Sequence, residues 1–124
     1  MTPTRTPQPA PHLTVIDAAG LTSFIEKGIG GTVTYRIDTR EGRIQHAEAS
    51  VGDSVVMLAD VPDGFSPLPA KLHLHVKDID AAHARALRAG AREILPPTDQ
   101  PDGDRRSGLR DIWGNEWWFT TEKI

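Results

Sequence analysis

Histidines are the residues of this sequence whose types and spacing point most clearly to chemistry. His73 and His75 alternate with apolar residues in the stretch LHLHV, and His46 stands two residues before Glu48. A period of two is typical of a strand with two different faces, so each pair is expected to share a face. Imidazole and carboxylate groups act as general bases, hydrogen-bond partners or metal ligands. The sequence has no cysteine, which excludes disulfides, thiolate metal sites and cysteine nucleophiles.

Composition narrows the class of protein. The 124 residues carry a net charge of −3, with 25% charged and 38% hydrophobic residues, as in an ordinary soluble domain. This balance gives no electrostatic argument for binding nucleic acid or a membrane. No apolar run approaches the roughly 20 residues of a membrane span. Residues 1–11 contain four prolines and no hydrophobic segment, so we expect a flexible leader, no secretory signal and a cytoplasmic protein.

Two similar units are expected to position the histidines. In the stretch 72–90 a strand leads to Asp78, which can cap a helix over 79–89 that Gly90 ends. Near the start of the chain, a strand over 12–16 leads to Asp17 and a helix over 18–27, followed by glycines. In the second unit the apolar helix stripe is expected to cover the strand face opposite His73 and His75.

Hairpins follow each unit. Strands are expected over 32–37, 44–51 and 54–60, with a tight turn at Gly52-Asp53 that sets Glu48 opposite Met57. A proline-rich linker over 61–70 leads to the second half, where strands are expected over 92–95, 108–111 and 116–121, and a loop over 96–107. The predicted fold class is α+β, with two βαβββ modules. A leader over 1–11 precedes a single domain, 12–124, with modules at 12–60 and 71–122.

A family resemblance extends over most of the chain. It is carried by Pro11-His12-Leu13, Asp17-Ala18-Ala19, GRIQHAEASVGDSVVMLAD at 42–60, LHLHVKDIDA at 72–81 and DQPDGDRRSGLRDIWGNEW at 99–117. The chain resembles the vicinal oxygen chelate superfamily of glyoxalase I, bleomycin resistance proteins and extradiol dioxygenases, and is most similar to the PhnB-like branch. The resemblance implies curled mixed sheets that enclose a ligand cavity. Because a βαβββ module leaves open edges, we expect a homodimer.

The resemblance also bears on metals. Metal-dependent members place His or Glu at four positions, which fall by spacing near Ala10, Met57, Lys71 and Trp118. None of these is a usual ligand of a divalent cation. We therefore expect no metal cofactor at the usual position of the superfamily.

The usual metal positions face the cavity, and side chains an even number of residues away along the same strands are expected to face it too. The predicted ligand-binding residues are His12, His46, Glu48, Met57, His73, His75 and Trp118, with Thr14 and Glu116 beside them. His83 is expected on the solvated side of its helix, and Trp117 and Phe119 in the core. Among the loop residues, Asp99, Asp102 and Asp104 are expected to be solvated, whereas Arg105 and Arg106 could hold an anionic group.

Three functions fit these residues. The first is a metal-free protein that binds or sequesters an aromatic or amphipathic compound, as the bleomycin resistance relatives do in antibiotic resistance. The second is a lyase, isomerase or dioxygenase that uses a rebuilt metal site. The third is a metal-free enzyme with a histidine as general base. The candidate catalytic residues for the last two are His46, Glu48, His73 and His75. The absence of the usual ligands favours the first.

Overall fold

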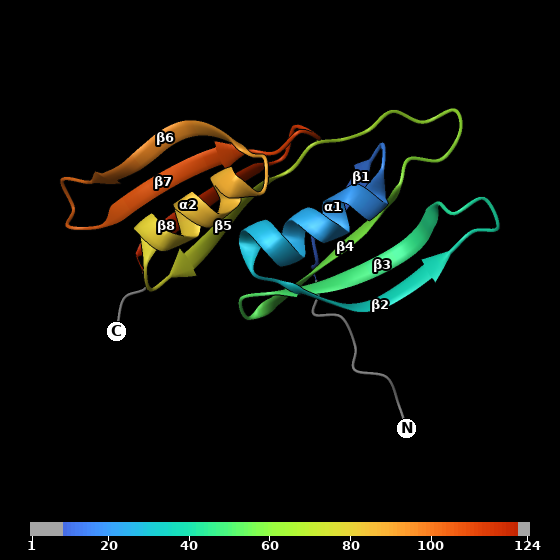
Figure 1. Cartoon of the computed structure of the whole chain (residues 1–124), viewed down its shortest axis with the longest axis horizontal. Helices are drawn as coiled ribbons and strands as arrows, with labels where there is room; N and C mark the ends of the chain where they lie inside the picture. The colour runs from blue at the N-terminus through green and yellow to red at the C-terminus, as the bar shows by residue number, and fades with distance from the viewer. Residues whose placement is uncertain (1–8, 122–124) are drawn as a thin grey trace, which may run out of the picture.

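The computed structural model describes residues 9–121 as two four-stranded mixed sheets that lie side by side (Figure 1). The first module contains β1 His12–Val15, α1 Ala18–Phe24, the π-helix η1 Ile25–Ile29, β2 Thr32–Asp38, β3 Ile44–Val51 and β4 Ser54–Asp60. The second contains β5 Lys71–Val76, α2 Ile79–Arg88, β6 Arg92–Asp99, β7 Arg105–Arg110 and β8 Glu116–Thr121. The predicted α+β class with two βαβββ modules is confirmed. The expected leader over 1–11 falls mostly outside the described residues.

Both sheets have the same topology. Their strand orders are β1-β4-β3-β2 and β5-β8-β7-β6, with the first strand of each module parallel to the last and all other pairs antiparallel. The hairpin register is as predicted, because Glu48 pairs with Met57 and Ser50 with Val55. Leu72, Leu74 and Val76 pack against the core. The histidines of β5 therefore lie on the face that α2 does not cover, as expected.

Side-chain carboxylates fix the start of both α-helices. Asp78 accepts a hydrogen bond from the backbone N–H of Ala81, the arrangement of an N-cap. Asp17 caps α1 through Gly20 although its own φ is +71°, a conformation that costs a non-glycine residue energy. The side chain of Asp60 supports this geometry, since one of its oxygens accepts the backbone N–H groups of Asp17 and Ala18. Asp60 thereby ties the end of β4 to the start of α1.

The first helix differs from the prediction. A single helix over 18–27 was expected, but the α-helix ends at Phe24 and continues as the wider π-turn of η1 to Ile29. The wider turn buries both Ile25 and Ile29, and Gly30 at φ +85° ends it. Gly28 is close to α2, because an added Cβ would lie 2.8 Å from the Cβ of Ala89. Within residues 9–121, no helix is long and apolar enough to cross a membrane.

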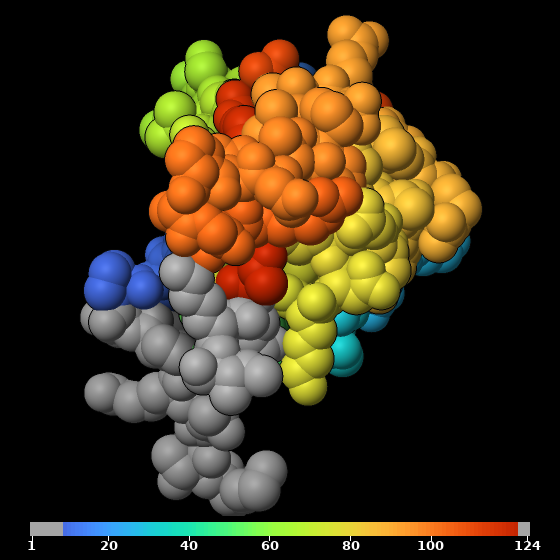
Figure 2. Space-filling view, turned by 90° about the vertical axis from the view of Figure 1, so that its left-hand side faces the viewer, coloured from blue at the N-terminus to red at the C-terminus, as the bar shows by residue number. Residues whose placement is uncertain are grey.

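The second half contains longer strands than predicted. The loop expected over 96–107 is wrong, because β6 runs through Pro96 and Pro97 to Asp99 and β7 begins at Arg105. Prolines are tolerated there because β6 is an edge strand, and the register shifts between Leu95 and Thr98. Arg105 holds this hairpin to the start of α2 through an ion pair with Asp80 at 3.0 Å, and it also pairs with Asp99 of β6 at 2.9 Å. Figure 2 shows this end of the molecule, with the orange hairpin segment against the yellow start of α2.

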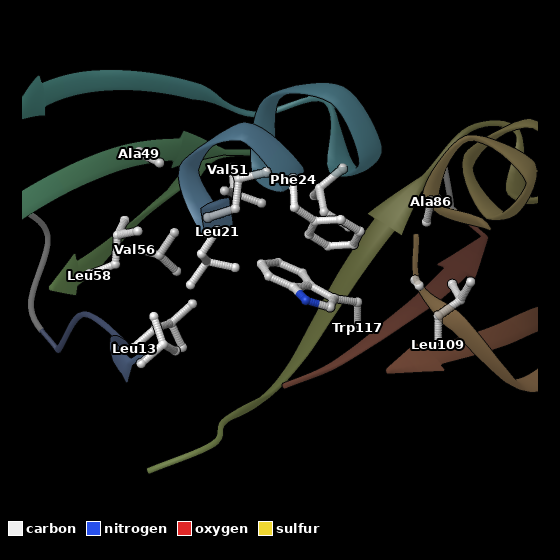
Figure 3. Close-up of a cluster of buried hydrophobic side chains, with 14 of the residues drawn as sticks. Leu13, Leu21, Phe24, Ala49, Val51, Val56, Leu58, Ala86, Leu109 and Trp117 are labelled. Atoms are coloured by element: carbon white, nitrogen blue, oxygen red, sulfur yellow. The ribbon is translucent and has the colours of Figure 1, made fainter. Parts of the chain in front are cut away.

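The two modules share one apolar core. Trp117 and Phe119 are fully buried, as expected. Figure 3 shows the indole of Trp117, from the second module, beside Phe24 and Leu21 of α1. The ring centroids of Phe24 and Trp117 are 6.2 Å apart, within the range of favourable aromatic pairs. The contact fixes the position of one sheet relative to the other.

Candidate functional site

The face of the first sheet opposite the core brings together predicted site residues. The rings of His12 and His46 are stacked with centroids 6.5 Å apart, and Tyr35 lies 6.1 Å from His46. His46 Nε2 is 2.9 Å from Glu48 Oε2. Met57 lies between the two strands that carry these groups, paired with His12 on one side and with Glu48 on the other. The sequence predicted all of these residues except Tyr35. Tyr35 pairs with Glu48 across β2 and β3, so its side chain lies on the same face of the sheet.

The His46–Glu48 pair has the geometry of an oriented general base. Both side chains are half-buried, with 30% and 24% of their surface exposed. An ionised carboxylate only accepts hydrogen bonds, so His46 Nε2 is the donor in this contact and Nδ1 faces away from Glu48. The neighbouring His12 is held toward its neutral form, because burial, and then the charge of His46, lower its pKa below the ordinary value.

The second sheet presents Trp118 as a flat aromatic surface. The indole and the ring of His73 are nearly parallel, at 10°, with centroids 6.3 Å apart. Trp118 Nε1 donates a hydrogen bond of 2.9 Å to Glu116. On the neighbouring strand, Gly108 makes room for the ring, since an added Cβ would lie 2.6 Å from two of its carbons. The indole therefore lies against the backbone of β7, and Lys71 Nζ lies over the ring, 5.2 Å from its centroid.

Positive groups surround this surface. The pKa of His73 is lowered first by burial and then by the charges of Lys71, Arg106 and His75. Glu116 is engaged, because it accepts the Trp118 indole and forms an ion pair with Arg110 at 3.1 Å. The sequence treated Arg106 as a loop residue, but it lies on β7 and pairs with Thr120 of β8. Arg106 therefore occupies the same face as Trp118.

A pocket of about 520 Å³ lies where the two modules meet. It is formed by the β3–β4 turn, the start of β1 and the exposed face of β5, and is lined by Pro11, Val51, Gly52, Asp53, Ser54, Val56, His73, Leu74 and His75. His73 and His75 thus share a pocket with residues of the first module. The contacts of His12, His46 and Glu48 described above stay within the first sheet. The structure places the predicted residues in two groups, one on each sheet, with the pocket beside the second group.

His83 is not where the sequence placed it, and the prediction of a solvated residue is wrong. Its surface is 3% exposed, and Nε2 lies 2.8 Å from Glu93 Oε1 of β6. The reason is helical spacing, because His83 falls on the same stripe as the buried Ile79, Ala82 and Ala86. That spacing was visible in the sequence. His83 is a structural residue between α2 and the second sheet.

Asp104 is a second correction. It was expected to be solvated with Asp99 and Asp102, but it is buried at 9% exposure. A tight turn folds it inward, because its N–H donates to Asp102 and its carbonyl accepts the N–H of Gln100. This turn leads directly into Arg105 and β7.

The most distinctive part of the family motif, LRDIWGNEW, serves the fold. Asp111 is buried and accepts hydrogen bonds from the backbone N–H groups of Trp113 and Asn115 and from the indole of Trp117. The buried Asn115 also donates to Asp111 and accepts the backbone N–H of Ala70 at the end of the linker. Buried polar groups of this kind are stable when every partner is satisfied.

The usual metal positions of the superfamily do not fit a metal here. Ala10, Met57, Lys71 and Trp118 offer a methyl group, a thioether, an ammonium and an indole, a donor set unsuited to a divalent cation. Across residues 9–121, no group of three or more His, Cys, Asp or Glu side chains is placed to hold a metal ion.

Comparison with known proteins places the chain in a family. A family model described as the Glyoxalase/Bleomycin resistance protein/Dioxygenase superfamily matches residues 8–119. An uncharacterized protein of Mycobacterium bovis is 33% identical over 122 residues, which cover 90% of this chain and 80% of the relative.

Solved structures agree with the family model. TioX from Micromonospora sp. ML1 has a TM-score of 0.79 at 24% identity, covering 98% of this chain and 100% of that chain. A PhnB protein from Bacillus cereus has a TM-score of 0.69 at 15% identity, covering 94% and 100%. At these low identities, the TM-scores establish a shared fold. With its family model and its two βαβββ modules, the chain belongs to the glyoxalase/bleomycin resistance protein/dioxygenase superfamily.

Proposed function

We propose that this protein binds a planar aromatic or amphipathic small molecule, without a metal, on the face of the second sheet. The observation that carries the proposal is the position of Trp118, half-buried and flat against Gly108 on the face away from the core. Stacked aromatic pairs contribute about 0.5–1.5 kcal/mol beyond the area that they bury. The pocket beside His73 and His75 gives such a ligand room to extend toward the first module.

Trp118 is organised in advance for this role. Its Nε1 is bound to Glu116, and Gly108 sets its plane, so little rotamer freedom is left to lose when a ligand arrives. The Lys71 ammonium over the ring is an exposed cation–π contact worth about 0.5–1 kcal/mol. A stacking ligand can therefore displace Lys71 at small cost.

Tryptophan fluorescence tests the proposal. A panel of planar aromatic compounds is titrated into the protein, and Trp118→Ala is expected to weaken binding by about 1–3 kcal/mol, since a central aromatic carries much of the affinity in such sites. Trp113→Phe, which retains an aromatic ring at its contact with Phe24, is the matched control and is expected to bind normally. Equal affinity in the wild type and in a folded Trp118→Ala variant would show that the indole of Trp118 does not bind the ligand.

The His46–Glu48 pair supports a second candidate, an enzyme of the glyoxalase type in which His46 is a general base. The 2.9 Å contact and the half-buried position are the supporting observations. Mass spectrometry of a bound compound after prolonged incubation distinguishes the candidates. A chemically altered compound, formed by the wild type and not by His46→Asn, supports catalysis, whereas an unchanged compound supports binding alone.

We also propose that the protein is a homodimer that sequesters its ligand, as the name of the bleomycin resistance proteins suggests for this family. Tyr35 and Ile37 of the edge strand β2 are exposed by 51% and 38%, beside the His12–His46 group. Exposed strand edges and apolar side chains favour association. Sedimentation at micromolar concentration is expected to give a dimer, and a monomer would contradict this part of the proposal.

A further inference from the structure

We infer that the ligand is an aromatic anion, whose negative group is bound by Arg106 while its ring stacks on Trp118. This inference rests on the proposed function and adds a chemical class to it. It depends on where Arg106 lies, on the absence of a compensating charge for it among residues 9–121, and on the distribution of acids around the pocket.

The strand register places Arg106 next to the aromatic surface. Across β5, β8 and β7, one row of paired residues is His73, Trp118 and Gly108, and the adjacent row on the same face is His75, Thr120 and Arg106. Adjacent rows on one face are separated by about 7 Å, the rise of two residues. A carboxylate attached to a ring stacked on Trp118 would therefore be within reach of the long side chain of Arg106.

Arg106 differs from its neighbours in its electrostatic surroundings. Arg105 is paired with Asp80 and Asp99, and Arg110 with Glu116. For Arg106, no ion pair is found among residues 9–121, and its Nε is buried without a hydrogen-bond partner. A partly desolvated guanidinium without a counter-charge attracts an anion more strongly than a solvated one does.

The surrounding charges also give the ligand an orientation. Lys71 lies over the Trp118 ring and Arg106 lies one row beyond it, and after burial the charges of both lower the pKa of His73. Asp53 of the β3–β4 turn contributes a carboxylate to the lining of the pocket beside His73 and His75. An anionic group is therefore favoured beside Arg106 and disfavoured beside Asp53, which directs the apolar part of the ligand toward the hairpin of the first module.

A matched pair of compounds tests the inference. The acid 2-naphthoate and its neutral analogue 2-naphthamide share a ring system, so that their difference in affinity isolates the charge. The wild type is expected to bind 2-naphthoate about tenfold more tightly than 2-naphthamide, because hydrogen bonds to charged groups are roughly twice as strong as neutral ones. The preference is expected to fall as salt is added.

Variants assign the preference to Arg106. Arg106→Gln is expected to abolish it while leaving the affinity for 2-naphthamide unchanged, and Arg106→Lys is expected to retain part of it. Arg105→Gln, one residue away on the same strand, is the control and is expected to retain it fully. Trp118→Ala is expected to weaken the binding of both compounds equally. This variant therefore tests the proposed function separately from the preference for an anion.

Each outcome is distinct. Equal binding of both compounds, still dependent on Trp118, would overturn the anion inference and leave the proposed function standing. Binding that is independent of Trp118, or no binding of either compound up to millimolar concentration, would overturn both. If Arg106→Gln and Trp118→Ala instead dissociate a dimer in sedimentation and leave the binding of 2-naphthoate unchanged, the face is a subunit interface and the inference is wrong.

Discussion

The six-membered ring of Trp118 covers Gly108 so closely that a Cβ at position 108 would lie 2.6 Å from Cε3 and Cζ3 of the indole. Gly108→Ala is therefore expected to push the indole out of its plane. Because Trp118 is half-buried, the added methyl group can displace it toward solvent, and the change in the free energy of unfolding should stay within about 1–3 kcal/mol. We expect weaker binding of planar aromatic compounds, measured by fluorescence titration. We expect the fold to be retained, as measured by circular dichroism.

The control for this variant is an alanine at Gly64, where an added Cβ meets nothing within 4 Å. Gly64 has φ +86°, so the alanine costs some stability. It should not change binding through Trp118. Normal binding by Gly108→Ala would show that the position of the indole is not set by Gly108.

His83 gives a prediction about stability. His83→Ala removes a buried side chain and its 2.8 Å contact with Glu93, so the free energy of unfolding is expected to fall by about 2–3 kcal/mol. His75→Ala, on an exposed strand face, should change it by less than about 0.5 kcal/mol. Urea unfolding measures both, and equal stability of the two variants would contradict the structural role of His83.

Asp111 is expected to be the most sensitive carboxylate of the second module. Asp111→Ala leaves buried donors on Asn115 and Trp117 without acceptors, at a cost of about 1–3 kcal/mol for each unsatisfied group. The exposed Asp53→Ala is the comparison. Thermal unfolding is expected to show a large loss for Asp111→Ala and little change for Asp53→Ala. A mild effect at Asp111 would indicate that water replaces its acceptors.

The protonation of His73 should respond to its neighbours. Burial, and then the charges of Lys71 and Arg106, lower the pKa of His73 below its ordinary 6.5. Between the lowered value and 6.5 the unfolded chain binds more protons at this position than the folded one. The contribution of neutral His73 to the free energy of unfolding is therefore complete above pH 6.5. It is lost as the pH falls through the pKa of His73 in the folded protein.

An NMR titration of the His73 ring measures this effect directly. The midpoint is expected below 6.5 in the wild type. Lys71→Met should raise it, because it removes a like charge, whereas Lys27→Met on η1 should leave it unchanged. A midpoint that does not move in Lys71→Met would mean that the charge of Lys71 does not contribute to the lowered pKa of His73.

The sequence predicted the fold well where the signal was local. Alternation located β3, β4 and β8 with their bounds, and the Gly52-Asp53 turn gave the pairing of Glu48 with Met57. It failed where tertiary packing overrides local preference. Pro96 and Pro97 read as a loop, yet they lie in an edge strand whose outer side needs no donor. The π-turn of η1 depends on the packing of η1 against α2, far along the chain.

The candidate site was predicted in part for the same reason. Parity assigned Trp118 and the histidines of β5 to the uncovered face, because it requires only a strand. It could not show that Trp118 stacks on Gly108, or that Arg105 has ion-pair partners whereas Arg106 has none within the described part of the chain. Those properties depend on which side chains meet across strands and helices, and the strand register settles them only after the chain has folded.

The aromatic contact between Phe24 and Trp117 has a consequence for cooperativity. Both side chains are at most 5% exposed, and each belongs to a different module, so neither module can bury its own apolar surface alone. Arg85 of α2 also donates to the carbonyl of Ile29, the last residue of η1. An isolated half would expose a large apolar patch to water. The duplicated architecture therefore unfolds as one thermodynamic unit, and heat should melt both repeats in a single transition.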